Sequence, residues 1–530
     1  MDNTQELELG CEEISSRIRS RMNSILRANL YDMNLSVKEK ERLTGHKKLL
    51  RKHIRLCALG NRNSKDALIS FIEDGISKIY KPDRNFWNKV WYFSSNNIKT
   101  VRYKFEVLLY IYEKKYGKDA LDMLLQEEEV AESVAGEQKV SAVSIERIYG
   151  RTCEDLDDEE KLHILAVRIY ENIWGLGSVD MLRDMRIDGL SGGVSGQNCV
   201  WIFYRGQTLA LPFMEIKHDE LERICRVLSR SCDNGQLSET RGYLVGDMAD
   251  HARVVIARPP FSEEWIFFIR KFDSAENKQL SALLLDEGAK YPIEMLKFFM
   301  KGCQVTAVTG VQGSGKTTLL SAMIGHIPKE YTLRVLEMAF ELHLRDSYPD
   351  RNIVTLRETA EIAGQEGLDL LKKTDGNVSI IGEVATAKVA SWMIESGMVG
   401  TLFTLFTHHA KTVDALVAAL RNCLLKEGSF SVEEIAEQQV VDVVRIDVHL
   451  HKDRSGHRYI ERISEIVPHR DGNRCYSENI LLRFEEGCYK IVNLPTDELV
   501  LDMKKWMDAE ERREFDEQLS IWAMEKERTL

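Results

Sequence analysis

Residues 310–317 read Gly-Val-Gln-Gly-Ser-Gly-Lys-Thr, a glycine-rich loop that ends in a lysine and a hydroxyl residue. The residues before it, 305–309, are Val-Thr-Ala-Val-Thr and predict a β-strand, whereas residues 317–325 favour a helix. A loop between such a strand and helix turns its backbone N–H groups toward phosphate groups, and the helix presents its positive end to them. The stretch therefore predicts a P-loop and, with it, an α/β domain.

Each position of this loop has a defined task in phosphate binding. The glycines allow the backbone geometry that the loop needs, Lys316 is expected to reach the β- and γ-phosphates, and the Thr317 hydroxyl is expected to ligate Mg²⁺. ATP and Mg²⁺ are therefore the expected ligands. The candidate nucleotide-binding residues of the loop are Gly310, Gly313, Ser314, Gly315, Lys316, Thr317 and Thr318.

Further strands follow the loop and alternate with helical segments. Strand-like runs at residues 333–337, 352–356, 378–381 and 400–406 predict a parallel sheet with helices on its faces. In such a sheet the ends of adjacent strands converge on the ligand. Polar residues at these strand ends are therefore candidates for the chemistry of the site.

Two carboxylates fall at such strand ends. The run Val-Ser-Ile-Ile-Gly-Glu at residues 378–383 has the form of a Walker B strand, which places Glu383 beside the metal and the attacking water. Glu337 ends the strand after the first helix and is a second candidate for orienting or activating water. The alternative for Glu383 is an acid at the end of a core strand that faces solvent. The alternative for Glu337 is a surface carboxylate that caps the next helix. Lys316, Glu383 and Glu337 are the candidate catalytic residues.

Two adjacent histidines, His408 and His409, follow the apolar run at residues 404–407. Histidine can hydrogen-bond a γ-phosphate or respond to its loss, and it titrates near physiological pH. A γ-phosphate sensor is the main hypothesis for the pair. A purely structural pair and a metal site are the alternatives, and the sequence does not choose between the two histidines as the sensor.

The composition narrows the class of protein. A chain of 530 residues with 44% hydrophobic and 29% charged residues predicts two or three folded domains. The net charge of −12 argues against a protein built chiefly to coat nucleic acid. The 10 cysteines form no Cys-x-x-Cys pair, and no segment approaches the roughly 18–20 apolar residues that span a bilayer. A cytoplasmic protein with free thiols fits these features.

The chain divides by pattern into five parts. Apolar residues at helical spacing favour a helical module at residues 1–125, and an acidic stretch poor in large apolar residues suggests a linker at 126–142. Residues 143–276 combine β-rich runs with a helix and predict an α+β domain. The nucleotide domain is expected at residues 277–470, and residues 471–530 form a C-terminal extension.

The order of these motifs resembles the secretion-superfamily ATPases that power type II and type IV secretion and pilus assembly, and within them the CpaF-type ATPases of Tad/Flp pilus systems. The likeness runs from Gly175 to Val467. Residues 336–342 are similar to the family's Asp box, residues 380–384 to its Walker B strand, and residues 396–411 to its Thr-Gly-His and His-box region.

The resemblance extends into the preceding domain. Residues 251–254, 259–260 and 268–271 follow the family's Gly-Ser-Arg, Pro-Pro and Ile-Arg-Lys pattern. It implies that Arg253 and Arg270 reach the phosphates or ribose of the nucleotide. The alternative is a pair of strand-edge arginines that pair with acids.

The sequence departs from the family pattern near the phosphates. Met338 stands in place of the Asp-box aspartate, and Ala385 replaces the arginine that usually follows Walker B. Each change removes a charge near the phosphates. Two consequences remain open: ATP hydrolysis is slow, or Lys372, Lys373 or Arg357 takes over the missing charge. The tetracysteine zinc site of the type II secretion and pilus extension branch is absent.

The resemblance implies a RecA-like ATPase that works as a homo-hexamer. Such a ring would lie in the cytoplasm at the inner face of the membrane and would act on a polytopic inner-membrane platform protein, so that hydrolysis powers pilus assembly or protein secretion. An ATP-binding scaffold with little turnover and a RecA-like nucleic-acid motor are the alternatives. No nucleic-acid partner is expected because no basic stretch interleaved with aromatic residues is present.

Overall fold

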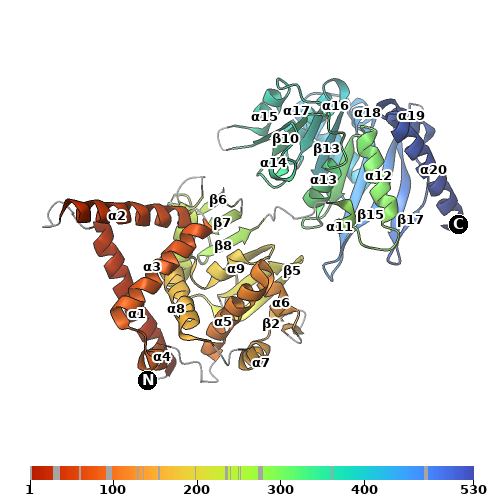
Figure 1. Ribbon diagram of the computed structural model, residues 1–530. Coiled ribbons are helices and arrows are strands. Elements are labelled where there is room, and N and C mark those ends of the chain that lie inside the picture. Colours follow the sequence, from red (N-terminus) through yellow and green to blue (C-terminus); the bar gives the residue numbers. More distant parts are fainter. Residues whose placement is uncertain are drawn as a thin grey trace. The chain divides into compact units, whose positions relative to one another are not determined.

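The structure is a computed structural model in which the chain forms two compact units, Met1–Phe272 and Asp273–Leu530, hereafter unit 1 and unit 2 (Figure 1). None of the helices in the described residues is long and apolar enough to cross a membrane. The residues that the structure describes are 3–27, 36–58, 61–90, 98–127, 130–134, 137–152, 156–196, 198–232, 237–238, 240–248, 250, 252–271, 279–359, 362–470 and 475–529.

Unit 1 begins with a group of helices that has a hydrophobic core of its own. Ile18, Ile72 and Ile76 are buried in this core, on faces formed by the helical spacing of apolar residues. Ile169 of a later helix joins the same core, so the group draws on residues beyond the stretch expected for it. The helices of the group are α1 (Asn3–Arg27), α2 (Val37–Ala58), α3 (Arg62–Tyr80), α4 (Arg84–Val90) and α8 (Asp158–Ile173).

The rest of unit 1 is built on an eight-stranded sheet whose neighbouring strands pair antiparallel, except for one parallel pair near one edge. In sheet order the strands are β1 (Ala131–Val134), β2 (Glu137–Val140), β5 (Gln207–Glu215), β4 (Cys199–Tyr204), β3 (Gly189–Gly192), β8 (Ile266–Arg270), β7 (Arg253–Ala257) and β6 (Tyr243–Asp247). The parallel pair is β2 with β5. Helices pack against the sheet, as in the edge-on contact between Phe105 and Phe213 at 5.3 Å between ring centroids.

Within the helical module expected at residues 1–125, the stretch 98–125 is not one continuous helix. The helix α5 (Ile98–Tyr116) ends at Gly117, whose φ of 60° lies in the left-handed region. Glycine adopts this conformation without the steric cost that a side chain adds. A short turn, η1 (Gly117–Asp119), then leads into α6 (Ala120–Leu125).

The acidic linker expected at residues 126–142 contains two of the strands, β1 and β2. Val130 and Val140 bury their side chains in the core of the sheet domain, which ties this segment to the fold despite its polar composition. Sequence pattern missed the segment because only these apolar residues are needed to fix two short edge strands. Other helices of this domain are α7 (Ala142–Thr152), η2 (Gly177–Val179), α9 (Asp180–Asp184) and α10 (His218–Arg230).

Unit 2 is organised around a nine-stranded sheet in which the first six strands in sheet order pair parallel and the last three continue it antiparallel. In that order the strands are β11 (Ile353–Arg357), β10 (Leu333–Glu337), β12 (Val378–Ile381), β13 (Phe403–His408), β9 (Thr306–Gly310), β14 (Ile446–Lys452), β15 (Arg458–Pro468), β16 (Tyr476–Glu485) and β17 (Cys488–Ile491). The strand before the P-loop, β9, is therefore central. Together with unit 1 this confirms the predicted α/β domain with a parallel sheet, preceded by an α+β domain and a helical region.

The central strands of unit 2 are buried along their whole length. Every residue of β9, β10 and β12 is buried, as expected for strands of a parallel sheet that is covered on both faces. The helices of unit 2 are α11 (Leu280–Leu283), α12 (Lys290–Lys301), α13 (Lys316–Ile324), α14 (Leu344–Ser347), α15 (Gly364–Leu371), α16 (Ala387–Val399), α17 (Val413–Glu427), α18 (Glu433–Val443), α19 (Asp497–Trp506) and α20 (Ala509–Thr529).

The C-terminal segment expected as an extension completes the core of unit 2. The strands β16 and β17 widen the sheet, and α20 packs beside β17 and α12. Phe515 and Trp522 of α20 are buried in the same core as the central strands. Residues 475–529 therefore fold with the nucleotide domain.

Candidate nucleotide site

The glycine-rich loop runs from the end of β9 to the start of α13. Gly310, Gly313 and Gly315 all have positive φ angles, of 141°, 76° and 96°. A side chain at Gly310 would also collide with the chain, because its Cβ would lie 2.4 Å from the Leu450 carbonyl oxygen. These positions need glycine for both backbone freedom and space, as the sequence predicted.

Lys316 begins α13 and folds its side chain back over the loop. Its Nζ donates to the carbonyl oxygens of Gly310 and Val311, each at 3.0 Å, and lies 3.3 Å from His409 Nδ1. The residue is 8% exposed. A lysine held this way is positioned at the loop mouth, where it can exchange carbonyl oxygens for phosphate oxygens.

The hydroxyl residues of the loop differ in their surroundings. Ser314 Oγ is buried and has no hydrogen-bond partner among the described residues, which leaves it able to pair with a bound group. Thr317 is half-buried, whereas Thr318 is exposed. Thr317 is therefore better placed than Thr318 to ligate a metal ion beside the phosphates, because its side chain is less exposed.

The other candidate residues of unit 2 lie at the carboxyl ends of adjacent strands. Glu337 ends β10, Glu383 follows β12 by two residues, and His408 ends β13, which pairs with β9. Parallel strands bring these ends to one edge of the sheet. The fold therefore gathers the residues that the sequence placed at strand ends.

A chain of polar contacts links three of these residues, Lys316, His409 and Glu383. His409 Nε2 lies 3.3 Å from Glu383 Oε1, and the other ring nitrogen faces Lys316. The Glu383 and His409 side chains are 42% and 47% exposed, so the acid is open to solvent and to a ligand. The loop that carries Glu383 is fixed from behind, because Val384 N donates to the Thr407 carbonyl oxygen at 3.0 Å.

The two histidines are not equivalent. His408 is half-buried, and its Nδ1 has no hydrogen-bond partner among the described residues. Burial lowers the pKa of His408, and the neighbouring His409 and Lys316 lower it further. His408 is therefore held neutral with an open ring nitrogen, whereas His409 makes the contacts to Lys316 and Glu383.

Glu337 is tied to the backbone after its strand. It is 3% exposed, and its Oε2 accepts hydrogen bonds from the N–H groups of Glu341 and Leu342 at 2.8 and 2.9 Å. The alternative for this residue was a surface carboxylate that caps the next helix, whereas Glu337 is buried and holds the turn before α14. The residue still lies beside Gly382, whose added Cβ would approach Glu337 Cγ to 3.2 Å.

The positions where the family's charges are missing are open on the surface. Met338 is 50% exposed, and Ala385 is also exposed. Of the cations offered as substitutes, Lys372 lies over the Trp392 ring at 4.8 Å and Arg357 over the Phe340 ring at 5.3 Å.

Behind the loop lies a buried polar cluster that sequence reasoning missed. Thr309 Oγ1 donates to Asp447 Oδ1 at 2.6 Å, and it lies 2.8 Å from His449 Nδ1. Arg462 Nη2 contacts Asp447 Oδ2 at 3.2 Å. Burial is the largest cause that raises the pKa of Asp447 to about 6 and lowers that of His449 to about 4. The alternation Asp447, Val448, His449 in an otherwise apolar strand was the available signal.

The two arginines expected to reach the nucleotide belong to unit 1. Arg253 starts β7 and Arg270 ends β8, and the two are direct partners in the antiparallel register. Arg253 Nε lies 3.9 Å from Asp247 Oδ1, as the alternative of strand-edge arginines paired with acids describes. His251, which opens the family-like run, falls outside the described residues.

The described residues contain no group of three or more His, Cys, Asp or Glu side chains placed to hold a metal ion. His408 and His409 have only Glu383 beside them as a further ligand type. The arrangement is thus one of phosphate-binding and proton-accepting groups. Mg²⁺ in P-loop sites takes most of its ligands from phosphates and water, so that one hydroxyl such as Thr317 suffices.

Comparisons with known proteins find matches to part of this chain. Residues 249–480 match the family described as "Type II/IV secretion system protein". Over 150 residues the chain is 26% identical to the competence protein ComGA of Bacillus subtilis (strain 168), a stretch that covers 28% of this chain and 42% of that protein. The match thus spans less than half the length of this curated relative.

Two solved structures show a partial likeness to this chain. The VirB11 ATPase from the Brucella suis type IV secretion system is 21% identical, with a TM-score of 0.30, and the match covers 53% of this chain and 89% of that chain. The ATPase DotB of Legionella pneumophila is 14% identical, with a TM-score of 0.39, and the match covers 66% of this chain and 90% of that chain. The P-loop, Glu383 and His409 all lie inside residues 249–480, the stretch of this chain that matches the family model.

Proposed function

We propose that this protein hydrolyses ATP to power pilus assembly or protein secretion through a membrane platform protein. The observation that carries the proposal is the contact chain from Lys316 through His409 to Glu383 at the mouth of the P-loop. It joins a phosphate-binding cation to an acid that can polarise water. The family match over residues 249–480 supports the same activity.

The residues of unit 2 have distinct tasks in this proposal. The loop glycines and Ser314 bind the phosphates, and Lys316 exchanges the carbonyl oxygens of Gly310 and Val311 for the β- and γ-phosphate oxygens. Mg²⁺, when bound, neutralises phosphate charge, and Thr317 is the hydroxyl placed to hold it. Glu383 accepts a hydrogen bond from the attacking water and orients it.

His409 couples this chemistry to the loop that follows β13. A bound γ-phosphate competes with His409 for contact with Lys316. When the γ-phosphate leaves, Lys316 Nζ returns to its contact with His409 Nδ1 at 3.3 Å. A loop that responds to the last phosphate can move a neighbouring element. His408, neutral and open at Nδ1, is the second candidate sensor.

The proposal includes assembly of the chain into a hexameric ring at the cytoplasmic face of the inner membrane. Arg253 and Arg270 then close over ATP held by their own chain or by a neighbour, so that hydrolysis becomes rotation between domains. The CpaF-like order of motifs supports a Tad/Flp-type pilus machine with a polytopic platform protein as the partner. Both arginines share one edge of paired strands, which lets them act together.

Turnover by the purified full chain tests this function. We expect Mg²⁺-dependent ATP hydrolysis that added DNA leaves unchanged. Several-fold stimulation by DNA would instead favour a nucleic-acid motor with the same core. A DNase-treated preparation serves as the control against carried-over nucleic acid.

An ATP-binding scaffold with little turnover is the second candidate. Exposed Met338 and Ala385 favour it, because the family places charges at both positions. ATP binding measured by calorimetry together with no detectable hydrolysis would support the scaffold and contradict the motor. Met338→Asp should raise turnover if the missing carboxylate limits the rate.

A further inference from the structure

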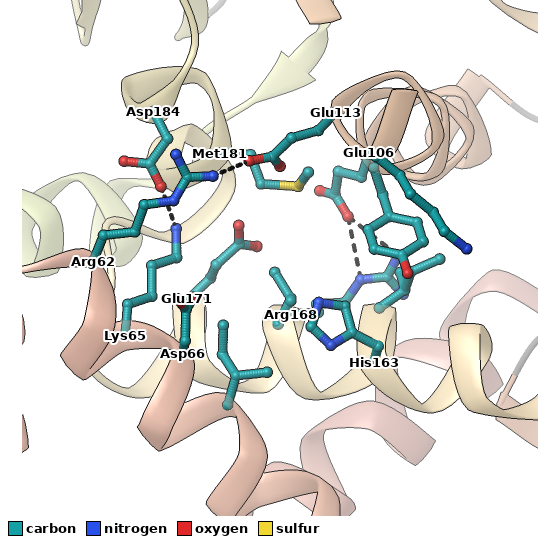
Figure 2. A pocket seen from close by; sticks show the side chains of 15 residues that line it. Arg62, Lys65, Asp66, Glu106, Glu113, His163, Arg168, Glu171, Met181 and Asp184 are labelled. Atoms are coloured by element: carbon teal, nitrogen blue, oxygen red, sulfur yellow. Dashed lines mark hydrogen bonds and ion pairs between the residues drawn. The ribbon is translucent and has the colours of Figure 1, made fainter. Parts of the chain in front are cut away.

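Unit 1 contains a cavity of about 270 Å³ that the nucleotide chemistry does not use. It lies where α3 and α8 of the helical group meet α5 and α9 of the sheet domain (Figure 2). The wall combines charged residues with an apolar part. The apolar side chains are Ile69, Ile164, Val167 and Met181.

The cations of this wall already have anionic partners. Lys65 Nζ contacts Asp184 at 2.7 Å and Asp180 at 3.0 Å, and it is only 16% exposed. An anionic ligand would have to break such pairs, at a cost that usually exceeds the gain. The other pairs are Arg62 with Glu113 at 2.5 Å, Arg168 with Glu106 at 3.1 Å and Lys114 with Glu160 at 2.8 Å.

One buried carboxylate of the wall, Glu171, has no such pair in the described residues. Glu171 is 3% exposed, and no donor lies within hydrogen-bond distance of its Oε1 among the described residues. Figure 2 shows this side chain directed into the cavity, between Lys65 and Arg168. A buried acceptor without a partner costs free energy that a bound donor would recover.

Burial raises the pKa of Glu171 well above its ordinary value, and the nearby carboxylates Glu106 and Asp180 raise it further. Lys65 and Arg168 oppose this rise but do not cancel it. The surroundings therefore favour the protonated carboxyl group over the charged one. A cation in the cavity would take the place of that proton.

We propose that this cavity binds an organic cation, an alkylammonium group whose N–H donates to Glu171 and whose aliphatic part packs on Ile164, Val167 and Met181. A positively charged group with an N–H donor would pair with Glu171, and the apolar side chains of the wall would contact its carbon chain. A divalent metal fits less well, because no group of three suitable ligands exists among the described residues.

The ligand would bridge two parts of unit 1. Glu171 belongs to α8 of the helical group, whereas Met181 belongs to α9 and Glu106 to α5, both of which pack with the sheet domain. A ligand that binds only the folded unit stabilises it by mass action. Occupancy of the cavity therefore strengthens the junction between the helical group and the sheet domain.

The test uses n-butylammonium chloride as the probe and the full chain as the protein. At pH 8, calorimetry is expected to detect binding to the wild type, with Kd at least about 10-fold weaker in Glu171→Gln. Glu159→Gln, an exposed acid of the same helix that does not line the cavity, is the matched control and should bind as the wild type. No binding to the wild type, or equal binding by Glu171→Gln, overturns the proposal.

Two further measurements keep the test independent of mutant folding. Tetramethylammonium has the charge but no N–H donor, so it should bind the wild type far more weakly than n-butylammonium. Binding of n-butylammonium should also weaken as pH falls from 8 to 5, because a proton then competes for Glu171. Equal binding of the two ions, or the same Kd at both pH values, contradicts the hydrogen bond to Glu171. Potassium chloride at the same concentration controls for ionic strength.

Discussion

Both units of this protein contain a group of charged side chains, but the two groups differ in how those side chains are paired. In unit 2 the carboxylates have donors: Asp447 is held by Thr309 and Arg462, and Glu383 faces His409. The cation Lys316 is held there by the carbonyl oxygens of Gly310 and Val311, beside a loop of backbone N–H groups. In unit 1 the cations are paired and a buried carboxylate, Glu171, has one oxygen without a hydrogen-bond partner among the described residues. We therefore propose an anion as the ligand of the first site and a cation as the ligand of the second.

The largest effect is expected at the anion site. Lys316→Ala should abolish ATP hydrolysis and strongly weaken ATP binding, because no other cation of the loop can contact the γ-phosphate. Turnover and calorimetric titration with ATP measure the two effects. Lys329→Ala, an exposed lysine after the same helix, is the control and should keep both. Wild-type turnover by Lys316→Ala would mean that the loop is not the nucleotide site.

Glu383→Gln is expected to leave ATP bound but to slow hydrolysis by at least about 10²-fold, the usual scale for a lost catalytic acid or base. Single-turnover kinetics with bound ATP separate this defect from weak binding. Glu337→Gln is the comparison. Because Glu337 caps the turn after β10, it should lower stability more than the rate of the chemical step. A normal rate in Glu383→Gln and a slow one in Glu337→Gln would reverse the assignment.

The arginines of unit 1 test whether the two units share a ligand. If Arg253 and Arg270 bind nucleotide, a non-hydrolysable ATP analogue should shift the chain toward larger species in sedimentation, by a coupling on the order of 10-fold in the assembly constant. The double change Arg253→Ala with Arg270→Ala should remove the shift. Arg230→Ala with Arg241→Ala, two exposed arginines of the same unit, should keep it. The same mass with and without the analogue would leave unit 1 as a docking module only.

Substitution of the two buried carboxylates should change stability in opposite directions. Asp447→Asn disrupts the contacts with Thr309 and Arg462 and should cost about 1–3 kcal/mol. Glu171→Gln removes the cost of a buried negative charge and should gain about as much at pH 8. Chemical unfolding measures both. A loss of stability in Glu171→Gln at pH 8 would show that the carboxylate has a partner in solution.

The raised pKa of Glu171 determines how the free energy of unfolding changes with pH. Above its ordinary pKa of 4.5 the unfolded chain releases the proton, while the folded chain, with its raised pKa, keeps it. The unfolded state then binds fewer protons, so the free energy of unfolding falls as pH rises through this window. Glu171→Gln should remove that part of the slope, whereas Glu159→Gln should not.

The sequence indicates the residues of the proposed nucleotide site far more readily than those of the cavity in unit 1. The P-loop, Glu383 and the histidines are close to strands whose apolar runs are readable, and a parallel sheet brings strand ends together whatever the details of packing. The cavity of unit 1 depends on helices α3, α5 and α8, which are separated along the chain. Glu171 carries no local signal, because only the packing of these helices buries it and leaves it without a donor.

Within unit 2, sequence reasoning failed where a side chain works through the backbone or through a neighbour. Glu337 was expected beside the water, but its position after β10 lets it accept two backbone N–H groups first. Asp447 and His449 were not selected, because polar residues in a closing strand are ordinary at exposed edges. Their importance comes from the pairing of β14 with β9, which puts them against Thr309.

A structure of the full chain with a non-hydrolysable ATP analogue and Mg²⁺ tests the central claim most directly. We expect the phosphates within the loop of Gly310 to Thr317, with Lys316 Nζ moved from the carbonyl oxygens of Gly310 and Val311 onto phosphate oxygens. Glu383 should then lie within one water molecule of the γ-phosphate, and His408 or His409 should contact it. Phosphates bound elsewhere, or Lys316 still held by its carbonyl oxygens with the analogue present, would contradict the account.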